Sequence, residues 1–157
     1  MIDDQFKEIV KNLQKKIDED EEMKYSKEVI SEYRHPTYFG VLDHPDAVGQ
    51  ITGPCGDTMK IALRITDATI RDARFWTDGC GPTIACGNML IKMIRNKTLQ
   101  QAAAITNITL LDALGGLPKE HEHCALLAVS TLHQAVENCK YNETMDEKND
   151  KKREGKV

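Results

Sequence analysis

The chain lacks the features that would place it in several large classes of protein. Its 157 residues contain no apolar run near the roughly 18 residues of a membrane span, and its N-terminal segment has no signal-peptide core. It also lacks the excess of lysine and arginine that nucleic-acid binding requires, since its formal net charge is -4. We therefore expect a cytoplasmic protein that binds neither membranes nor nucleic acid.

What is present favours one globular domain with a terminal segment on each side. Hydrophobic residues make up 40% of the chain and charged residues 29%, an ordinary mixture for a domain of this length. We expect a helical extension over residues 1–24, a folded domain over 25–142, and a charged, disordered tail over 143–157. The extension carries an apolar stripe at helical spacing, formed by Phe6, Ile9, Val10, Leu13 and Ile17.

Within the expected domain, helical and strand patterns occupy separate stretches. Period-two alternation over residues 59–65 and 70–77, joined by a polar turn, predicts an antiparallel hairpin with one wet face. A further strand is expected over 48–52. Helices are expected over 25–33 with Ser26 as N-cap, and over 83–97, 99–105, 110–114 and 122–142.

The cysteines carry the chemical information in this sequence. They are odd in number and widely spaced, with no Cys-x-x-Cys pair, at Cys55, Cys80, Cys86, Cys124 and Cys139. In a reducing compartment such cysteines are ligands, nucleophiles or core residues rather than a disulfide framework. For Cys86 and Cys139, on apolar helix faces, the favoured interpretation is a small buried side chain.

Two cysteines are different because each lies between glycines at an end of the hairpin. Cys55 belongs to the turn Gly53–Asp57 before the first strand, and Cys80 follows the second strand. Because the start of one antiparallel strand and the end of its neighbour meet at one edge of the sheet, we expect Cys55 and Cys80 to lie close together. Asp57 adds a carboxylate at the same edge.

A third cysteine, Cys124, opens the last expected helix directly after His123. A helix N-terminus lowers the pKa of a thiol, so we expect Cys124 to be a thiolate if it packs beside the other two. Thiolates, an imidazole and a carboxylate around one point form a set suited either to zinc or to iron–sulfur chemistry.

Three stretches together resemble a known family. Gly53–Lys60, Asp72–Ala85 and Glu122–Ala125 are similar to the cysteine motifs of the iron–sulfur cluster scaffold family called IscU, or the NifU N-terminal domain. The resemblance runs from about Tyr25 to Tyr141. It implies an α+β fold with a three-stranded antiparallel sheet and helices packed on one face, to which residues 1–24 add an extra N-terminal helix.

The resemblance also implies a function and a set of site residues. It implies a scaffold without enzymatic activity that receives sulfur from a cysteine desulfurase, builds a [2Fe-2S] cluster from iron and sulfur, and transfers the cluster to apo-proteins. Cys55, Cys80 and Cys124 match the family's ligand cysteines, Asp57 its carboxylate and His123 its histidine. Cys124 would then be the persulfide acceptor. Asp57, whose hard oxygen binds iron less tightly than a thiolate does, would keep the cluster labile.

The sequence departs from the family near the third cysteine. Bacterial members often carry Leu-Pro-Pro-Val-Lys there, the segment read by a dedicated Hsp70, whereas this chain has Leu117–His121. The difference argues against Hsp70 docking and puts His121 beside the site. Cys86 replaces a small residue of the family, so a fourth thiolate near the site is the second interpretation of that cysteine.

A second function remains open at this point. The related SufU type holds zinc on a similar set of residues and carries sulfur, but its members have an insertion between the second and third cysteines. Here 43 residues separate Cys80 from Cys124, which fits the form without the insertion. Three cysteines leave one ligand position for His123, Asp57 or a partner's thiol, so a homo-dimer bridged by a cluster is also expected.

Overall fold

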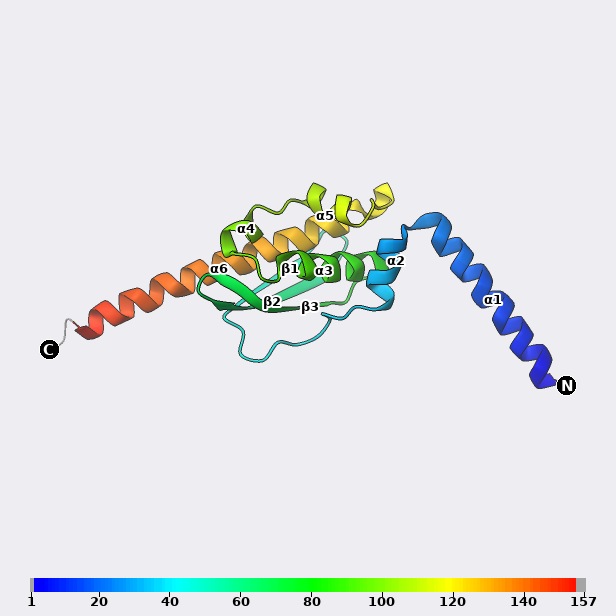
Figure 1. Cartoon of the computed structure of the whole chain (residues 1–157), viewed down its shortest axis with the longest axis horizontal. Helices are drawn as coiled ribbons and strands as arrows, with labels where there is room; N and C mark the ends of the chain where they lie inside the picture. The colour runs from blue at the N-terminus through cyan, green and yellow to red at the C-terminus, as the bar shows by residue number, and fades with distance from the viewer. Residues whose placement is uncertain (1, 155–157) are drawn as a thin grey trace.

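The computed structural model describes residues 2–154 and shows a small α+β body with a helix projecting from each end (Figure 1). The elements, in chain order, are α1 (Ile2–Lys24), α2 (Lys27–Arg34), β1 (Ala47–Thr52), β2 (Thr58–Thr66), β3 (Thr69–Thr77), α3 (Gly81–Ile94), α4 (Leu99–Ala103), α5 (Asn107–Ala113), the 3-10 turn η1 (Lys119–His121) and α6 (Glu122–Glu154).

The three strands form one antiparallel sheet in the order β1-β2-β3. The predicted hairpin is β2–β3, and its two turn residues, Asp67 and Ala68, have φ of 51° and 60°. Positive φ at both positions matches the right-handed twist of the flanking strands. The register pairs Met59 with Thr77, so the start of β2 and the end of β3 lie side by side.

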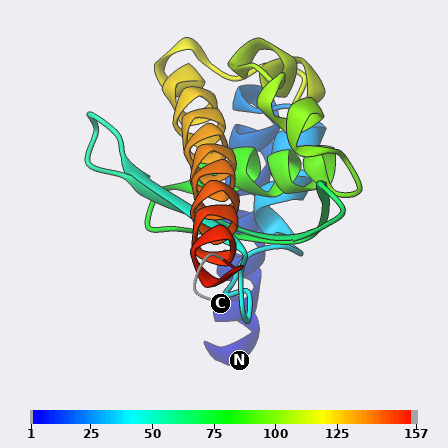
Figure 2. The same ribbon diagram turned by 90° about the vertical axis from the view of Figure 1, so that its left-hand side faces the viewer.

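The helices cover one face of this sheet, as predicted. In Figure 2 α6 and the helices between residues 81 and 113 lie on the same side of the strands. Between the sheet and the helices lies a continuous core, to which Phe75, Leu90 and Leu132 contribute fully buried side chains. The other face is crossed by the loop between α2 and β1.

A buried polar network attaches α2 to α3. Glu32 is 5% exposed, and its carboxylate accepts hydrogen bonds from Asn88 Nδ2 at 2.5 Å and Lys92 Nζ at 2.6 Å. The Asn88 Oδ1 in turn accepts from the backbone N–H of Tyr38 at 3.0 Å. A buried carboxylate is tolerated because it is paired and hydrogen-bonded in this way. The network thus fixes α2 and the start of the following loop against the second half of α3.

Helix α1 stands apart from the body. It is anchored near its C-terminal end, where Arg34 contacts Asp18 Oδ1 at 3.0 Å and Glu21 Oε2 at 2.5 Å. Its apolar stripe stays exposed, with Phe6 at 64% and Leu13 at 56%. Within the described residues, no helix is both long and apolar enough to cross a membrane.

The predicted helix boundaries differ from the structure by one to three residues at several ends, including α4, which ends at Ala103 rather than 105, and two of the differences have a clear physical cause. Helix α3 ends at Ile94 rather than 97, because Asn96 adopts φ of 63° and the chain then pairs with β3 through Ile70. Asn96 N–H donates to Ile70 O and Ile70 N–H donates to Lys97 O, both at 2.8 Å. Helix α5 begins three residues before the predicted position, where Thr106 caps it by accepting from Thr109 N–H.

The predicted disordered tail over 143–157 is also different in the structure. Helix α6 continues to Glu154, and residues 155–157 lie outside the described part of the chain. The segment after Asn142 is rich in Glu and Lys and contains no proline or glycine before Gly155. Glu and Lys are good helix formers, and nothing in that stretch interrupts a helix already nucleated by packing.

Substitution of Gly49 by alanine tests the packing of β1 against α6. A Cβ at Gly49 would lie 2.4 Å from Thr131 O and 2.7 Å from Ala135 N, both backbone atoms that cannot turn aside. We expect Gly49→Ala to lower the free energy of unfolding by about 3 kcal/mol. Urea denaturation with an unchanged m-value measures this.

The control is Gly81→Ala, whose Cβ would meet only the Tyr33 ring at 3.5 Å. We expect this variant to unfold near the wild-type midpoint. Equal midpoints for the two alanine variants would contradict the close β1–α6 approach.

Candidate metal and sulfur site

The turn that carries Cys55 closes on itself directly before β2. Gly53 N–H donates to Asp57 O at 2.8 Å, and Gly56 N–H donates back to Gly53 O at 3.0 Å. Gly56 has φ of 90°, a value that glycine adopts without strain. The turn leaves Cys55 exposed at its tip and Asp57 half-buried beside the sheet.

The turn that carries Cys80 lies against the same edge of the sheet. Thr58 N–H donates to Asp78 Oδ1 at 2.8 Å, which ties the end of β3 to the start of β2. Cys80 is the N-cap residue of α3, and Pro82 stands in the first turn of that helix. The prediction that the Cys55 and Cys80 turns share one edge of the sheet is therefore confirmed.

Thr83 connects the two turns with the last helix. Its side-chain Oγ1 lies 3.3 Å from Cys124 Sγ, 3.5 Å from Asp57 Oδ2 and 3.8 Å from Cys80 Sγ. Thr83 itself is fully buried. One hydroxyl group thus has two thiols and a carboxylate around it, each from a different element of the fold.

Cys124 lies on the first turn of α6 and is 1% exposed. Its Sγ is 3.8 Å from His123 Nε2. The pKa of the Cys124 thiol is raised to about 11: burial is the largest cause, the charges of Cys80, Asp57 and Cys55 also raise it, and the Thr83 hydrogen bond lowers it. The prediction of a thiolate at this helix N-terminus is therefore wrong for the metal-free protein, because burial is the largest influence on this pKa and raises it.

The side chains of His121 and His123 lie next to each other near Cys124. Their ring centroids are 6.5 Å apart, and His121 lies 6.0 Å from the ring of Tyr25. His123 is exposed while His121 is half-buried. His123 therefore lies beside the Cys124 thiol, whereas His121 adjoins the site through the rings of His123 and Tyr25.

The predicted ligands gather without yet forming a closed coordination shell. Asp57, Cys80 and Cys124 surround Thr83, whereas Cys55 stays exposed on its turn. Among the residues that the structure describes, no three His, Cys, Asp or Glu side chains are close enough to hold a metal ion as they stand. Thiols and a carboxylate are nevertheless the donors that iron and zinc take.

The remaining cysteines belong to the core. Cys86 is fully buried on α3, and burial raises the pKa of its thiol well above its usual range, with smaller contributions from Cys124 and Cys80. Cys139 is 4% exposed on α6. Both positions favour the interpretation as buried small side chains, although Cys86 borders the site.

Sequence reasoning missed Thr83. A signal was present: Thr83 follows Cys80 by three residues at the start of a helix, and residues three apart share one face of a helix. The proximity of Thr83 to Asp57 and Cys124, by contrast, comes from tertiary packing.

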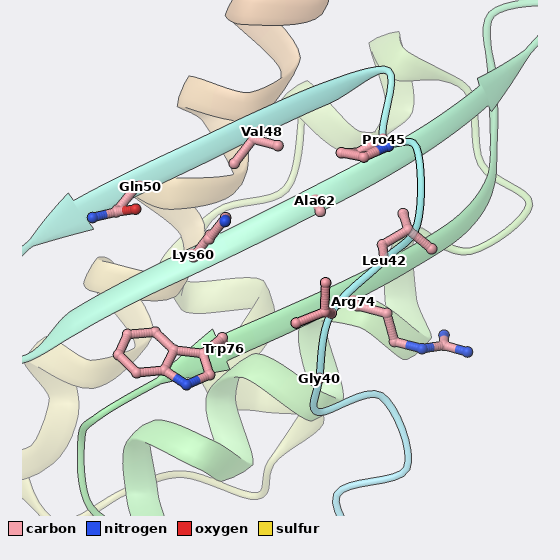
Figure 3. A pocket seen from close by; sticks show the side chains of 10 residues that line it. Gly40, Leu42, Pro45, Val48, Gln50, Lys60, Ala62, Arg74 and Trp76 are labelled. Carbon is pink, nitrogen blue, oxygen red and sulfur yellow. The ribbon is translucent and has the colours of Figure 1, made fainter.

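A hollow of about 300 Å³ lies on the sheet face opposite the helices (Figure 3). Its lining is mostly apolar, with Lys60 and Arg74 among the polar side chains and Trp76 at one end. It contains none of the cysteines, carboxylates or imidazoles of the site. The chemistry of the chain is thus at the sheet edge rather than in this hollow.

The fold and the site together define a class of protein: a small α+β domain that gathers cysteine thiols and a carboxylate at one edge of a three-stranded sheet. Comparison with known proteins gives the family. The NifU-like N terminal domain matches residues 24–146, and the chain belongs to this family. The matched region begins where α1 ends.

Relatives of known name support the same assignment. The iron-sulfur cluster assembly scaffold protein IscU 1 of Archaeoglobus fulgidus is 38% identical over 113 residues, covering 71% of this chain and 74% of its own. The IscU scaffold protein of Escherichia coli K12 is 36% identical over 123 residues, covering 75% of this chain and 95% of its own.

A solved structure shows the same fold. The putative scaffold protein for the SUF system from Fervidobacterium islandicum aligns with a TM-score of 0.59 at 19% identity, covering 71% of this chain and 96% of its own. At that identity the likeness concerns the fold alone. The α+β prediction with a three-stranded sheet is confirmed.

The exposures of the cysteines predict an order of chemical reactivity. In the reduced, metal-free protein we expect Cys55 and Cys80, which are exposed, to be alkylated at least tenfold faster than the buried Cys124 and Cys139. Timed labelling with a maleimide, followed by peptide mass mapping, gives the rate at each cysteine. In urea the rates should converge; a Cys124 that labels as fast as Cys55 in the native protein would contradict its buried placement.

Proposed function

We propose that this protein is an iron–sulfur cluster assembly scaffold. Iron and sulfur are its cargo: it assembles them into a [2Fe-2S] cluster and passes the cluster to apo-proteins. The observation that carries the proposal is the convergence of Asp57, Cys80 and Cys124 on Thr83, next to the turn of Cys55. Family membership and the names of the relatives point the same way.

The proposed ligands are Cys55, Cys80 and Cys124, with Asp57 or His123 in the fourth position. Thiolates are the usual ligands of iron in such clusters. Three thiolates with a carboxylate or an imidazole also suit zinc, which would occupy the site when no cluster is present. A thiol from a second copy of the chain is the other candidate for the fourth position, and would make the loaded protein a dimer.

Cys124 is the proposed sulfur acceptor. The Cys124 thiolate attacks the outer sulfur of the persulfide on a cysteine desulfurase. A new S–S bond forms on Cys124, the S–S bond of the desulfurase breaks, and the thiolate of that enzyme leaves. His123, with Nε2 at 3.8 Å from Cys124 Sγ, is placed to take up the thiol proton. The protein donates and accepts sulfur without turnover of its own, so we class it as a scaffold and not as an enzyme.

Asp57 is proposed to make the cluster transferable. Its carboxylate oxygen is a harder ligand than a thiolate, so the iron bound to it exchanges more readily. Two partners follow, a cysteine desulfurase that supplies sulfur and apo-proteins that take the cluster, both in the cytoplasm. The Leu117–His121 segment still argues against docking of the dedicated Hsp70.

Anaerobic reconstitution tests the proposed function. The protein is incubated with ferrous iron, cysteine, a cysteine desulfurase and a thiol reductant such as dithiothreitol, which supplies the electrons that reduce the persulfide sulfur to sulfide, and the visible absorption is followed. We expect a cluster chromophore that is then transferred to an apo-ferredoxin. We expect each of three variants to lose most of the chromophore, because each lacks one proposed thiolate ligand: Cys55→Ala, Cys80→Ala and Cys124→Ala.

Cys139→Ala is the matched control, since it removes a cysteine from the core of α6 away from the site, and it should keep the chromophore. An iron chromophore that never forms, with zinc tightly held and sulfur still accepted on Cys124, would instead assign the protein to the zinc-bound sulfur carriers.

The role of Asp57 has its own test. We expect the Asp57→Ala variant to retain its reconstituted cluster several times longer than the wild type under chelator challenge, because the exchangeable oxygen ligand is gone. The decay of the chromophore after addition of a chelator measures this. Asp112→Ala is the control, since it removes an exposed carboxylate on α5, outside the site. Equal or faster decay in Asp57→Ala would reject the role.

A further inference from the structure

Thr83 occupies a position that the proposed function does not yet explain. It is a fully buried threonine at the third position of α3, next to a thiol site in which the other cysteines of the turns are exposed. A buried hydroxyl needs a hydrogen-bond partner. The groups close enough to serve are the proposed ligands Cys124, Asp57 and Cys80, at 3.3, 3.5 and 3.8 Å.

The fold makes room for this side chain. A Cβ at Gly79 would lie 2.8 to 2.9 Å from the Cβ, Cγ2 and Oγ1 of Thr83, closer than such atoms approach in proteins. The glycine before Cys80 therefore serves the placement of Thr83 as well as the turn. Gly79 N–H also donates to Thr77 Oγ1 at 3.1 Å, which holds the turn at the end of β3.

A hydroxyl has one proton to donate, so it can donate to one of the three neighbours at a time. Cys124 Sγ is the nearest of them. Cys124 is 1% exposed, yet a thiol that receives sulfur from another protein has to reach the surface. The thiol must therefore leave its contact with Thr83 before it can react.

We propose that the Thr83 hydroxyl is a latch that holds Cys124 in an inward position beside Asp57 and Cys80 and so sets how often this thiol is presented to a sulfur donor. Thr83 acts through Cys124 and is a positioning residue. When Cys124 turns outward, the hydroxyl keeps only its longer contacts to Asp57 and Cys80, at 3.5 and 3.8 Å, so opening costs the hydrogen bond to Cys124. The latch rests on the proposed function of Cys124 as sulfur acceptor.

Three substitutions at position 83 separate the hydroxyl from the packing. Thr83→Val keeps the shape and removes the hydroxyl, Thr83→Ala removes both hydroxyl and methyl, and Thr83→Ser keeps the hydroxyl and loses the methyl. The measurement is the rate of Cys124 alkylation in the reduced, metal-free full chain, resolved from the other cysteines by peptide mass mapping. Cys55 is the internal control because it is exposed and does not contact Thr83.

Loss of one hydrogen bond from the closed form should raise the population of the open form, and hence the alkylation rate of Cys124, about three- to tenfold. We expect this increase in Thr83→Val and Thr83→Ala and a rate near wild type in Thr83→Ser, with the Cys55 rate unchanged in all three. If Thr83→Val does not fold, as thermal melting will show, Thr83→Ala against Thr83→Ser still isolates the hydroxyl.

The latch is overturned if the valine and alanine variants label at the wild-type rate, or if serine accelerates labelling as much as alanine does. The second result would mean that packing, rather than the hydroxyl, holds Cys124. The experiment contains no iron and no desulfurase. Its failure is therefore distinct from a failure of the scaffold function, which only the reconstitution of the chromophore reports.

Discussion

The pairing of β2 with β3 is the constraint on which the site depends. The register that places Met59 opposite Thr77 brings the turn before β2 and the turn after β3 to one edge of the sheet. A slip of one residue would turn the buried side chains of the shifted strand outward. The buried Ile61 and Phe75 therefore secure the register, and with it the proximity of the Cys55 and Cys80 turns.

The position of Cys124, the third cysteine of the site, depends on a different contact. Cys124 reaches the sheet edge because α6 lies across β1, and α6 can lie that close because Gly49 has no side chain where Thr131 and Ala135 pass. The N-terminal turn of α6 is thereby held next to α3. Gly49 thus helps to position the Cys124 thiol, which lies more than 70 residues later in the sequence.

The site combines groups with different degrees of freedom. Cys55 is on an exposed turn, Cys80 caps a helix, and Cys124 is buried on another helix. Donors spread over three elements can adjust separately, which suits a protein that takes up sulfur, holds a cluster and gives it away. A rigid, closed set of four ligands would bind metal more tightly but would release it slowly.

Much of this arrangement follows from local features of the sequence. Period-two alternation predicts the hairpin, Ser26 marks the start of α2, and antiparallel geometry alone predicts that Cys55 and Cys80 meet. The resemblance of the cysteine motifs led to the fold and the family. These features are readable because strand periodicity, capping and turn chemistry depend on residues near one another in the chain.

Other features were decided by tertiary structure. The early end of α3 depends on Asn96 pairing with Ile70, and the high pKa of Cys124 depends on burial, which no local pattern reports. The role of Thr83 at the centre of the site arises only when α3, α6 and the Asp57 turn come together. The sequence by itself determined which thiols, carboxylate and imidazole are the candidate ligands. Packing decided which of them are buried and which hydroxyl lies between them, because burial and long-range contact exist only in the folded chain.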